Sequence, residues 1–200
     1  MRRAWKPPAQ INAGMTGTFT ERKSMKFTSC IVALCATTLF FSPAIFAQKA
    51  KAAPDTLSLA LYERANETFV QGDVEHAIVF YRQLMDREKA RPSLPKVQWH
   101  TFVNNFGMAY GITRKLDNAE EIFRYGIARD STYPLFYYNL ACTYGERGDM
   151  KNSIKYLKIA FKYKEHRFPG EILPDPLSVN PFERFSDNRT FIDSVKAMRR

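Results

Sequence analysis

Side chains that could perform acid–base or metal chemistry are few and scattered in this 200-residue chain. The three histidines, His76, His100 and His166, have no second histidine or carboxylate at the spacing of a helical metal site such as His-Glu-x-x-His. An isolated histidine is more often a solvated surface residue than a ligand. We therefore expect all three at the surface, with no metal and no other cofactor.

Nucleophilic chemistry has equally little support. Cys142 would need a base beside it, and no paired histidine follows from the sequence pattern. We interpret it as a small residue of a groove or core. The nine glycines form no phosphate-binding loop, and the adjacent carboxylates Glu120 and Glu121 point to different sides of a helix. The sequence thus predicts a protein that is not an enzyme; an enzyme with an unrecognised site is the less favoured alternative.

One charge pattern is organised, and it lies near the C-terminal end. Four lysines recur with helical spacing along one face, and Lys164 and Arg167 extend the row. Such a stripe could contact a membrane surface or another anion. We expect instead a solvated face that acidic residues of the C-terminal tail partly neutralise, and no nucleic acid as partner. The four lysines are Lys151, Lys155, Lys158 and Lys162.

The elements that carry these residues repeat with a period of 34. Residues 103–131 overlay residues 137–165 at this shift, with large residues on large residues and small residues on small ones. A fixed period of this length indicates stacked helical units, each of which buries its apolar face only against a neighbour. The matched pairs include Val103 with Tyr137, Asn105 with Asn139, Phe106 with Leu140, Gly107 with Ala141, Tyr110 with Tyr144, Ala119 with Ser153 and Phe123 with Leu157.

A weaker third copy lies upstream, at an offset of 42. Here Ala77 aligns with Ala119 and Tyr81 with Phe123. The connection after this first unit is expected to carry eight extra residues around 89–95, where prolines favour a turn. The second copy has Arg114 where a glycine commonly opens the turn between helices. We predict three units, the first being an atypical terminal one.

The order of large residue, Gly or Ala, aromatic, Ala and second aromatic resembles the tetratricopeptide repeat. The resemblance implies an all-α fold: three helix-turn-helix repeats, at about 58–91, 100–133 and 134–167, in a right-handed superhelical array over 58–168. Gly107 and Ala141 are small because two helix backbones should cross closely there. The family consists of scaffolds that bind proteins or peptides. The resemblance therefore implies an interaction module, but the sequence does not identify its partner.

In this family the first helices of successive units line a concave groove. Carried over to this chain, the groove is aromatic and rich in amides, with almost no charge, although some of its rings could simply pack against one another. The cations that clamp a C-terminal carboxylate in some members are replaced by Tyr62, Leu135 and Asn139, so an extended or helical apolar segment is the expected ligand. The predicted lining is Tyr62, Asn66, Phe69, Thr101, Asn104, Asn105, Met108, Leu135, Tyr138 and Cys142.

The N-terminus predicts export. Residues 25–47 have a basic start, an apolar run over 31–41 and small residues before Gln48, which is the form of a signal peptide cleaved near Ala47. The protein would then be periplasmic or secreted; an uncleaved N-terminal anchor is the alternative. Residues 1–24 are an upstream extension or a long basic region, so Met1, Met15 and Met25 all stay open as the start. Residues 48–57 are expected to be a linker.

After the third unit, residues 169–200 read as a proline-rich turn followed by capping helices. This region resembles the closing segment of many bacterial tetratricopeptide proteins, where short helices cover the exposed face of the last repeat. The sequence as a whole predicts an exported, non-catalytic scaffold that binds a peptide segment or a partner protein. A structural homo-oligomer or an envelope-complex subunit is the alternative. The expected apolar cover comprises Leu177, Phe182, Phe185, Phe191 and Ile192.

Overall fold

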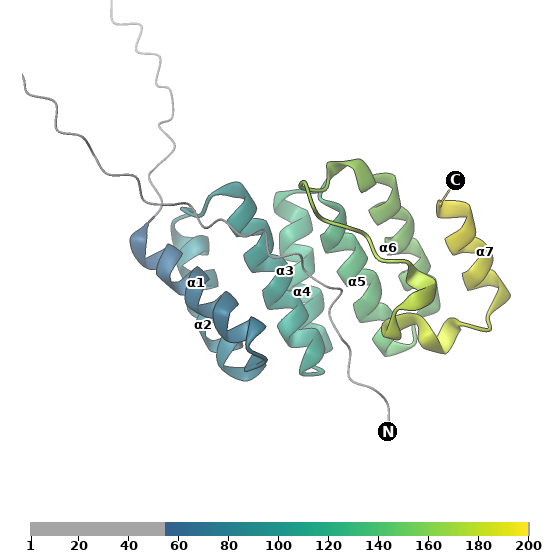
Figure 1. The fold of residues 1–200 in the computed structure, drawn as a ribbon, viewed down its shortest axis with the longest axis horizontal. Helices are drawn as coiled ribbons and strands as arrows, with labels where there is room; N and C mark the ends of the chain where they lie inside the picture. The colour runs from purple at the N-terminus through teal and green to yellow at the C-terminus, as the bar shows by residue number, and fades with distance from the viewer. Residues whose placement is uncertain (1–54, 200) are drawn as a thin grey trace, which may run out of the picture. The chain divides into compact units, whose positions relative to one another are not determined.

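A computed structural model describes residues 55–199, and all the regular structure in that range is helical (Figure 1). Residues 1–54 lie outside it, including the predicted extension, the signal peptide and most of the predicted linker. No helix in the described range has both the length and the apolar character needed to cross a bilayer. The α-helices are α1 (Thr56–Val70), α2 (Val74–Ala90), α3 (Lys96–Ile112), α4 (Leu116–Arg129), α5 (Pro134–Arg147), α6 (Met150–Lys162) and α7 (Arg189–Met198).

The first six helices form three pairs, α1 with α2, α3 with α4, and α5 with α6, and successive pairs lie side by side (Figure 1). Short polar residues start several of these helices. Asp55 accepts a hydrogen bond from the Leu57 N–H (3.2 Å), and Asp149 accepts one from the Asn152 N–H (3.0 Å), which satisfies amides that have no partner in the first turn. The fold is the all-α array of helix pairs that the sequence period predicts.

Small residues lie where the helices of a pair cross. Ala65, Ala77, Ala119 and Ala141 are completely buried. At Gly107 a Cβ atom would lie 2.4 Å from Cε1 of Phe123, well inside van der Waals contact. The space that a larger residue would need is therefore filled by the aromatic ring of the second helix. The predicted alternation of small and aromatic positions has this direct steric cause.

Most of the eight extra residues after the first unit lengthen the helices, whereas the sequence had suggested a longer connection. Helices α2 and α3 have 17 residues each, against 14 in α4 and α5, and the connection itself is only one residue longer. The buried carboxylate of Glu88 keeps the connection short, because it accepts hydrogen bonds from the N–H groups of Ser93 (3.0 Å) and Leu94 (3.1 Å). Helix α3 begins four residues before the predicted start of the second repeat. At the other end of the array, α1 begins inside the predicted linker.

The turn within each pair uses a left-handed backbone conformation. Gly72 and Gly148 adopt φ values of 88° and 82° in the first and third units. Arg114 holds the same position in the second unit with φ of 62°, a conformation that a side chain disfavours. Its guanidinium forms an ion pair with Glu146 on α5. Arginine at this position strains the backbone more than glycine would, but its side chain links the second unit to the third.

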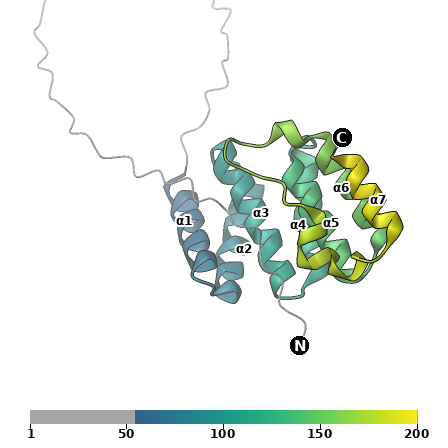
Figure 2. The same cartoon turned by 45° about the vertical axis from the view of Figure 1, so that its right-hand side comes forward.

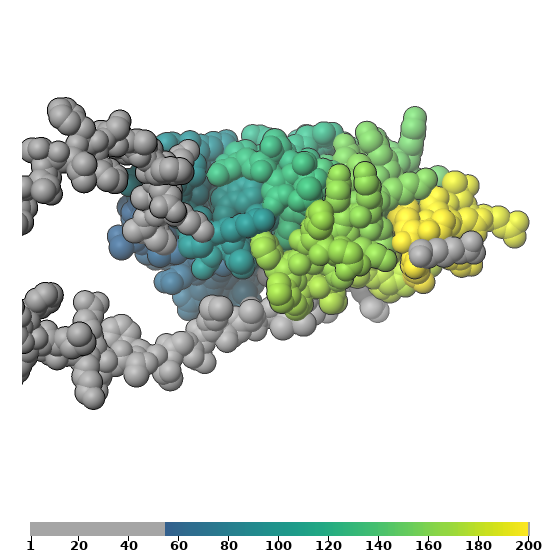
Figure 3. All heavy atoms as spheres, turned by 90° about the horizontal axis from the view of Figure 1, so that it is seen from above, coloured from purple at the N-terminus to yellow at the C-terminus, as the bar shows by residue number. Residues whose placement is uncertain are grey.

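The chain after α6 folds back onto the third pair. It forms three short 3₁₀ helices, η1 (Lys164–His166), η2 (Pro176–Ser178) and η3 (Asn180–Phe185), of which η3 packs against α5, while α7 packs against α6 (Figures 1 and 2). In the space-filling view this segment forms one continuous surface with the third pair (Figure 3). Phe182, Phe185 and Phe191 are buried there. Leu177, predicted to join them, is 37% exposed.

Candidate binding groove

The predicted groove residues lie on α1, α3 and α5, but most of them are not open to a partner. The buried members include Phe69 on α1, several residues of α3, and both Tyr138 and Cys142 on α5. Their side chains pack between helices, so fewer of the predicted groove residues are accessible than we expected from the sequence. The half-buried members are Tyr62, Asn66, Thr101 and Leu135, and the remaining buried ones are Asn104, Asn105 and Met108.

The C-terminal segment covers the part of the groove that α5 was expected to supply. The ring of Phe182 meets that of Tyr138 edge to face, with ring centres 6.3 Å apart. A Cβ atom at Gly145 would lie 2.5 Å from the carbonyl oxygen of Pro181, so this glycine lets the segment approach closely. The third unit therefore presents its concave side to its own chain. From the sequence we expected the cap and the groove to be separate surfaces. In the structure, the C-terminal segment lies on the groove residues of α5.

Two amide pairs connect successive first helices. Asn66 Oδ1 on α1 accepts hydrogen bonds from Tyr81 Oη (2.6 Å) and from Asn105 Nδ2 on α3 (3.0 Å). Asn139 Nδ2 on α5 donates to Asn104 Oδ1 on α3 at 2.5 Å. Buried amides need such partners, because an unpaired one would cost about 1–3 kcal/mol. These asparagines therefore stabilise the stacking of the units, a role that the groove interpretation had not given them.

The part of the predicted groove that stays accessible is a small polar surface on the first two units. Tyr62 of α1 and Thr101 of α3 are both half-buried and interact through their hydroxyls across the two units. Burial raises the pKa of Tyr62, and hydrogen bonds with Thr101 and Asn66 oppose that rise. The phenol therefore stays neutral at physiological pH and can both donate and accept a hydrogen bond. Uncharged rings and hydroxyls of this kind can bind a peptide backbone without ionic selectivity.

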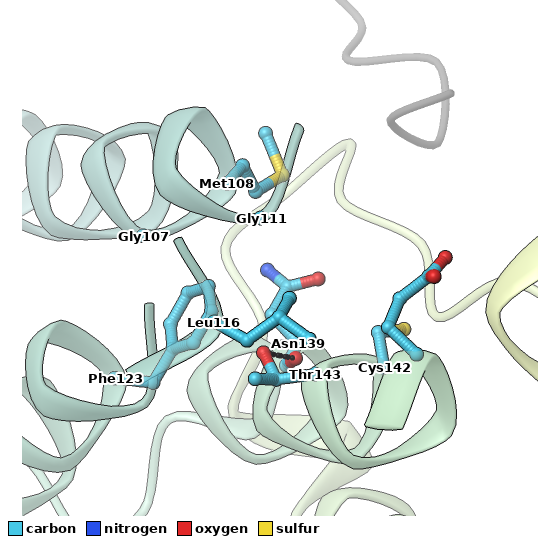
Figure 4. A pocket seen from close by; sticks show the side chains of 9 residues that line it. Gly107, Met108, Gly111, Leu116, Phe123, Asn139, Cys142 and Thr143 are labelled. Atoms are coloured by element: carbon cyan, nitrogen blue, oxygen red, sulfur yellow. Dashed lines mark hydrogen bonds between the residues drawn. The ribbon is translucent and has the colours of Figure 1, made fainter. Parts of the chain in front are cut away.

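A cavity of about 10 Å³ lies between α3, α4 and α5 (Figure 4). Met108 and Gly111 line it from α3, and Asn139, Cys142 and Thr143 from α5. Its volume corresponds to about one water molecule, so it cannot hold a small-molecule substrate. The Thr143 hydroxyl is already used, since it donates to the carbonyl oxygen of Asn139 at 3.0 Å (Figure 4).

The groups with catalytic potential are held in unreactive environments. Cys142 is 5% exposed, and burial raises the pKa of its thiol, so no thiolate nucleophile is available. Among residues 55–199, no three His, Cys, Asp or Glu side chains come together in a way that could hold a metal ion. The buried thiol of Cys142 is therefore not an activated nucleophile.

His100 departs most from its sequence interpretation. It is 2% exposed rather than at the surface, and its ring stacks on Phe136 with centres 5.5 Å apart. Nδ1 lies 2.6 Å from the carbonyl oxygen of Lys96, and Nε2 lies 3.0 Å from Oδ2 of Asp130. Both nitrogens lie against oxygen atoms of the protein and the ring is buried, so neither nitrogen faces an open site. The histidine instead ties α3 to the connection before α5.

Comparisons with known proteins agree with this architecture. Residues 135–166, which span α5 and α6, match the family model described as tetratricopeptide repeat. No curated protein matches the chain. Among solved structures, the chain is similar to the Sgt2 TPR domain from Aspergillus fumigatus, with a TM-score of 0.51 and 16% sequence identity over 74% of this chain and 84% of that one. Residues 135–166 are thus similar to a tetratricopeptide repeat, and the described helices have the fold of a tetratricopeptide repeat array.

Proposed function

We propose that this protein is an exported, non-catalytic scaffold that binds a peptide segment or partner protein on the concave side of α1 and α3. The observation that carries the proposal is the polar surface of Tyr62, Asn66 and Thr101, which stays accessible where the rest of the groove is filled. The matching repeat and the fold support it, because arrays of this kind act through binding.

The chemistry of this surface favours an extended, uncharged segment. Tyr62 and Thr101 offer hydroxyl groups, while Leu135, at the start of α5, adds half-buried apolar area. None of these four residues, Tyr62, Asn66, Thr101 and Leu135, carries a charge. Selection for a ligand carboxylate is therefore weak, and main-chain hydrogen bonds with apolar contacts would supply most of the affinity.

A display library of unstructured peptides, panned against the full chain, tests the proposal. For the peptides that bind, we expect the double variant Tyr62→Ala/Thr101→Ala to weaken binding roughly 30-fold, as loss of a central contact residue does. Titration calorimetry measures the change, and a melting curve confirms that the variant is folded.

The matched control alters the convex side of the array. Gln83→Ala/Glu121→Ala removes two exposed side chains from the second helices α2 and α4. It should leave peptide affinity unchanged within a factor of about two. If both double variants weaken binding equally, or if neither does, the concave surface of α1 and α3 is not the binding site.

Export forms a separate part of the proposal and is supported by the sequence of residues 25–47 alone. N-terminal sequencing of the protein isolated from its host should begin at Gln48. A chain that keeps the apolar run and sediments with membranes would replace cleavage by anchoring. A soluble cytosolic precursor would contradict export altogether.

A further inference from the structure

The third unit differs in charge from the two before it. The second helices α2 and α4 each carry three carboxylates among their basic residues, whereas α6 has none between Met150 and Lys162. Its lysines, at positions 151, 155, 158 and 162, are all exposed and recur at the spacing of one helix face. They form a row roughly 16 Å long. We call this row the lysine stripe.

From the sequence we expected the tail to neutralise the lysine stripe in part, but among residues 55–199 no tail carboxylate forms an ion pair with it. Within residues 55–199, no carboxylate lies within 4.0 Å of any of the four ammonium groups. The tail acids closest in sequence have other partners. Glu171 accepts hydrogen bonds from Tyr133 Oη (2.6 Å) and the Phe168 N–H (2.8 Å), and Asp175 pairs with Arg199. The lysine stripe is thus exposed and has no ion-pair partner in the described range, while Asp149, at the start of α6, interacts electrostatically with Lys151.

We propose that the lysine stripe docks the protein onto an anionic phospholipid surface. Four ammonium groups in a row match a plane of phosphate charges, and each adds attraction without requiring a fixed partner geometry. All four residues are lysines, which are strongly hydrated point charges, and none is an arginine suited to bidentate recognition of one phosphate. Their long stems let the ammonium groups reach a surface while the helix stays packed on α5.

Features beside the lysine stripe favour lipid over nucleic acid. Single-stranded nucleic acid binds where exposed aromatic rings stack on bases, but Tyr156 on α6 is only 8% exposed and lies beneath Lys155, 5.2 Å from its ammonium group. Tyr156 is therefore not available to stack on a base.

Vesicle flotation of the full chain, purified from its host, tests this inference. At about 150 mM salt, the protein should float with vesicles containing about 30 mol% phosphatidylglycerol, and much less with pure phosphatidylcholine. The variant K151Q/K155Q/K158Q/K162Q should lose roughly 100-fold in partition coefficient on the anionic vesicles. The altered side chains are exposed, so the melting curve should not change.

A charge-matched control keeps the lysine stripe and removes four exposed cations of the first unit, as R64Q/R82Q/K89Q/R91Q. It should retain nearly full binding to the anionic vesicles. Equal losses in both variants would show diffuse attraction of a basic protein and overturn the proposal. The same holds if the stripe variant binds anionic vesicles normally, or if it loses affinity for a single-stranded RNA oligonucleotide while its vesicle binding is unchanged.

Discussion

Glu120 on α4 connects the second unit to the third through a set of charged and hydroxyl groups. It accepts hydrogen bonds from Tyr144 Oη (2.7 Å), Arg124 Nε (2.8 Å) and Arg147. Burial opposes ionisation of the carboxyl, but these bonds outweigh it and lower the pKa of Glu120 to about 2. A partly buried carboxylate with several donors contributes more than an isolated surface ion pair.

The depressed pKa of Glu120 predicts acid sensitivity. An unfolded glutamate titrates near 4.5, so the stabilisation is fully present above that pH and is lost as the pH falls toward about 2. Glu120→Gln should lower the free energy of unfolding at pH 7 by about 2 kcal/mol. It should also flatten the dependence of stability on pH between about 5 and 2. Urea unfolding across this range measures both effects.

Glu121→Gln serves as the control, because it removes the same charge from an exposed neighbour that takes part in no ion pair among the described residues. This variant should keep the acid dependence of the parent. Identical pH profiles for the parent and for Glu120→Gln would show that the hydrogen-bonded set around Glu120 adds nothing to stability.

At the scale of elements, the C-terminal segment acts as part of the core. Phe182 is 1% exposed and packs on Tyr138 and on Phe191, whose ring centre is 5.5 Å away. It thereby bridges α5 and α7. Leu177 belongs to the same segment but is 37% exposed, which makes the two residues a natural pair for comparison.

Phe182→Ala should lower the free energy of unfolding by about 3–5 kcal/mol, because it empties a fully buried aromatic position. Leu177→Ala should change it by less than about 0.5 kcal/mol, as an exposed substitution does. Thermal and urea unfolding of the two variants give the comparison. Similar, small effects of both would mean that the segment only rests on α5 and could be displaced by a partner.

The helices were largely predictable from sequence, because each unit of 34 residues needs small residues where its two helices pack closely. The register followed from small residues such as Gly107 that face rings such as Phe123. Contacts between distant residues were not predictable. Asp130 lies 30 residues from His100, and Pro181 lies 36 residues from Gly145, so neither partner could be inferred from spacing. The groove was misjudged because a repeat pattern carries no information about which segment covers it.

At the scale of the whole array, the units are coupled by polar bonds within an otherwise aromatic core. The pair Asn66–Asn105 joins the first unit to the second, and Asn104–Asn139 joins the second to the third. Because these bonds are buried or half-buried, loosening one interface leaves amides without partners, and this cost couples the stability of neighbouring units. The array should therefore unfold as a single cooperative unit.

The two ends of the array differ, because the C-terminal segment packs against Gly145 and covers the last helix pair. Helix pairs appended after α6 would first have to displace Phe182 from α5, whereas the first pair keeps Leu57, Val70 and Val79 exposed. A protein engineer wishing to lengthen this array should therefore graft new modules ahead of α1 and leave the carboxyl end untouched.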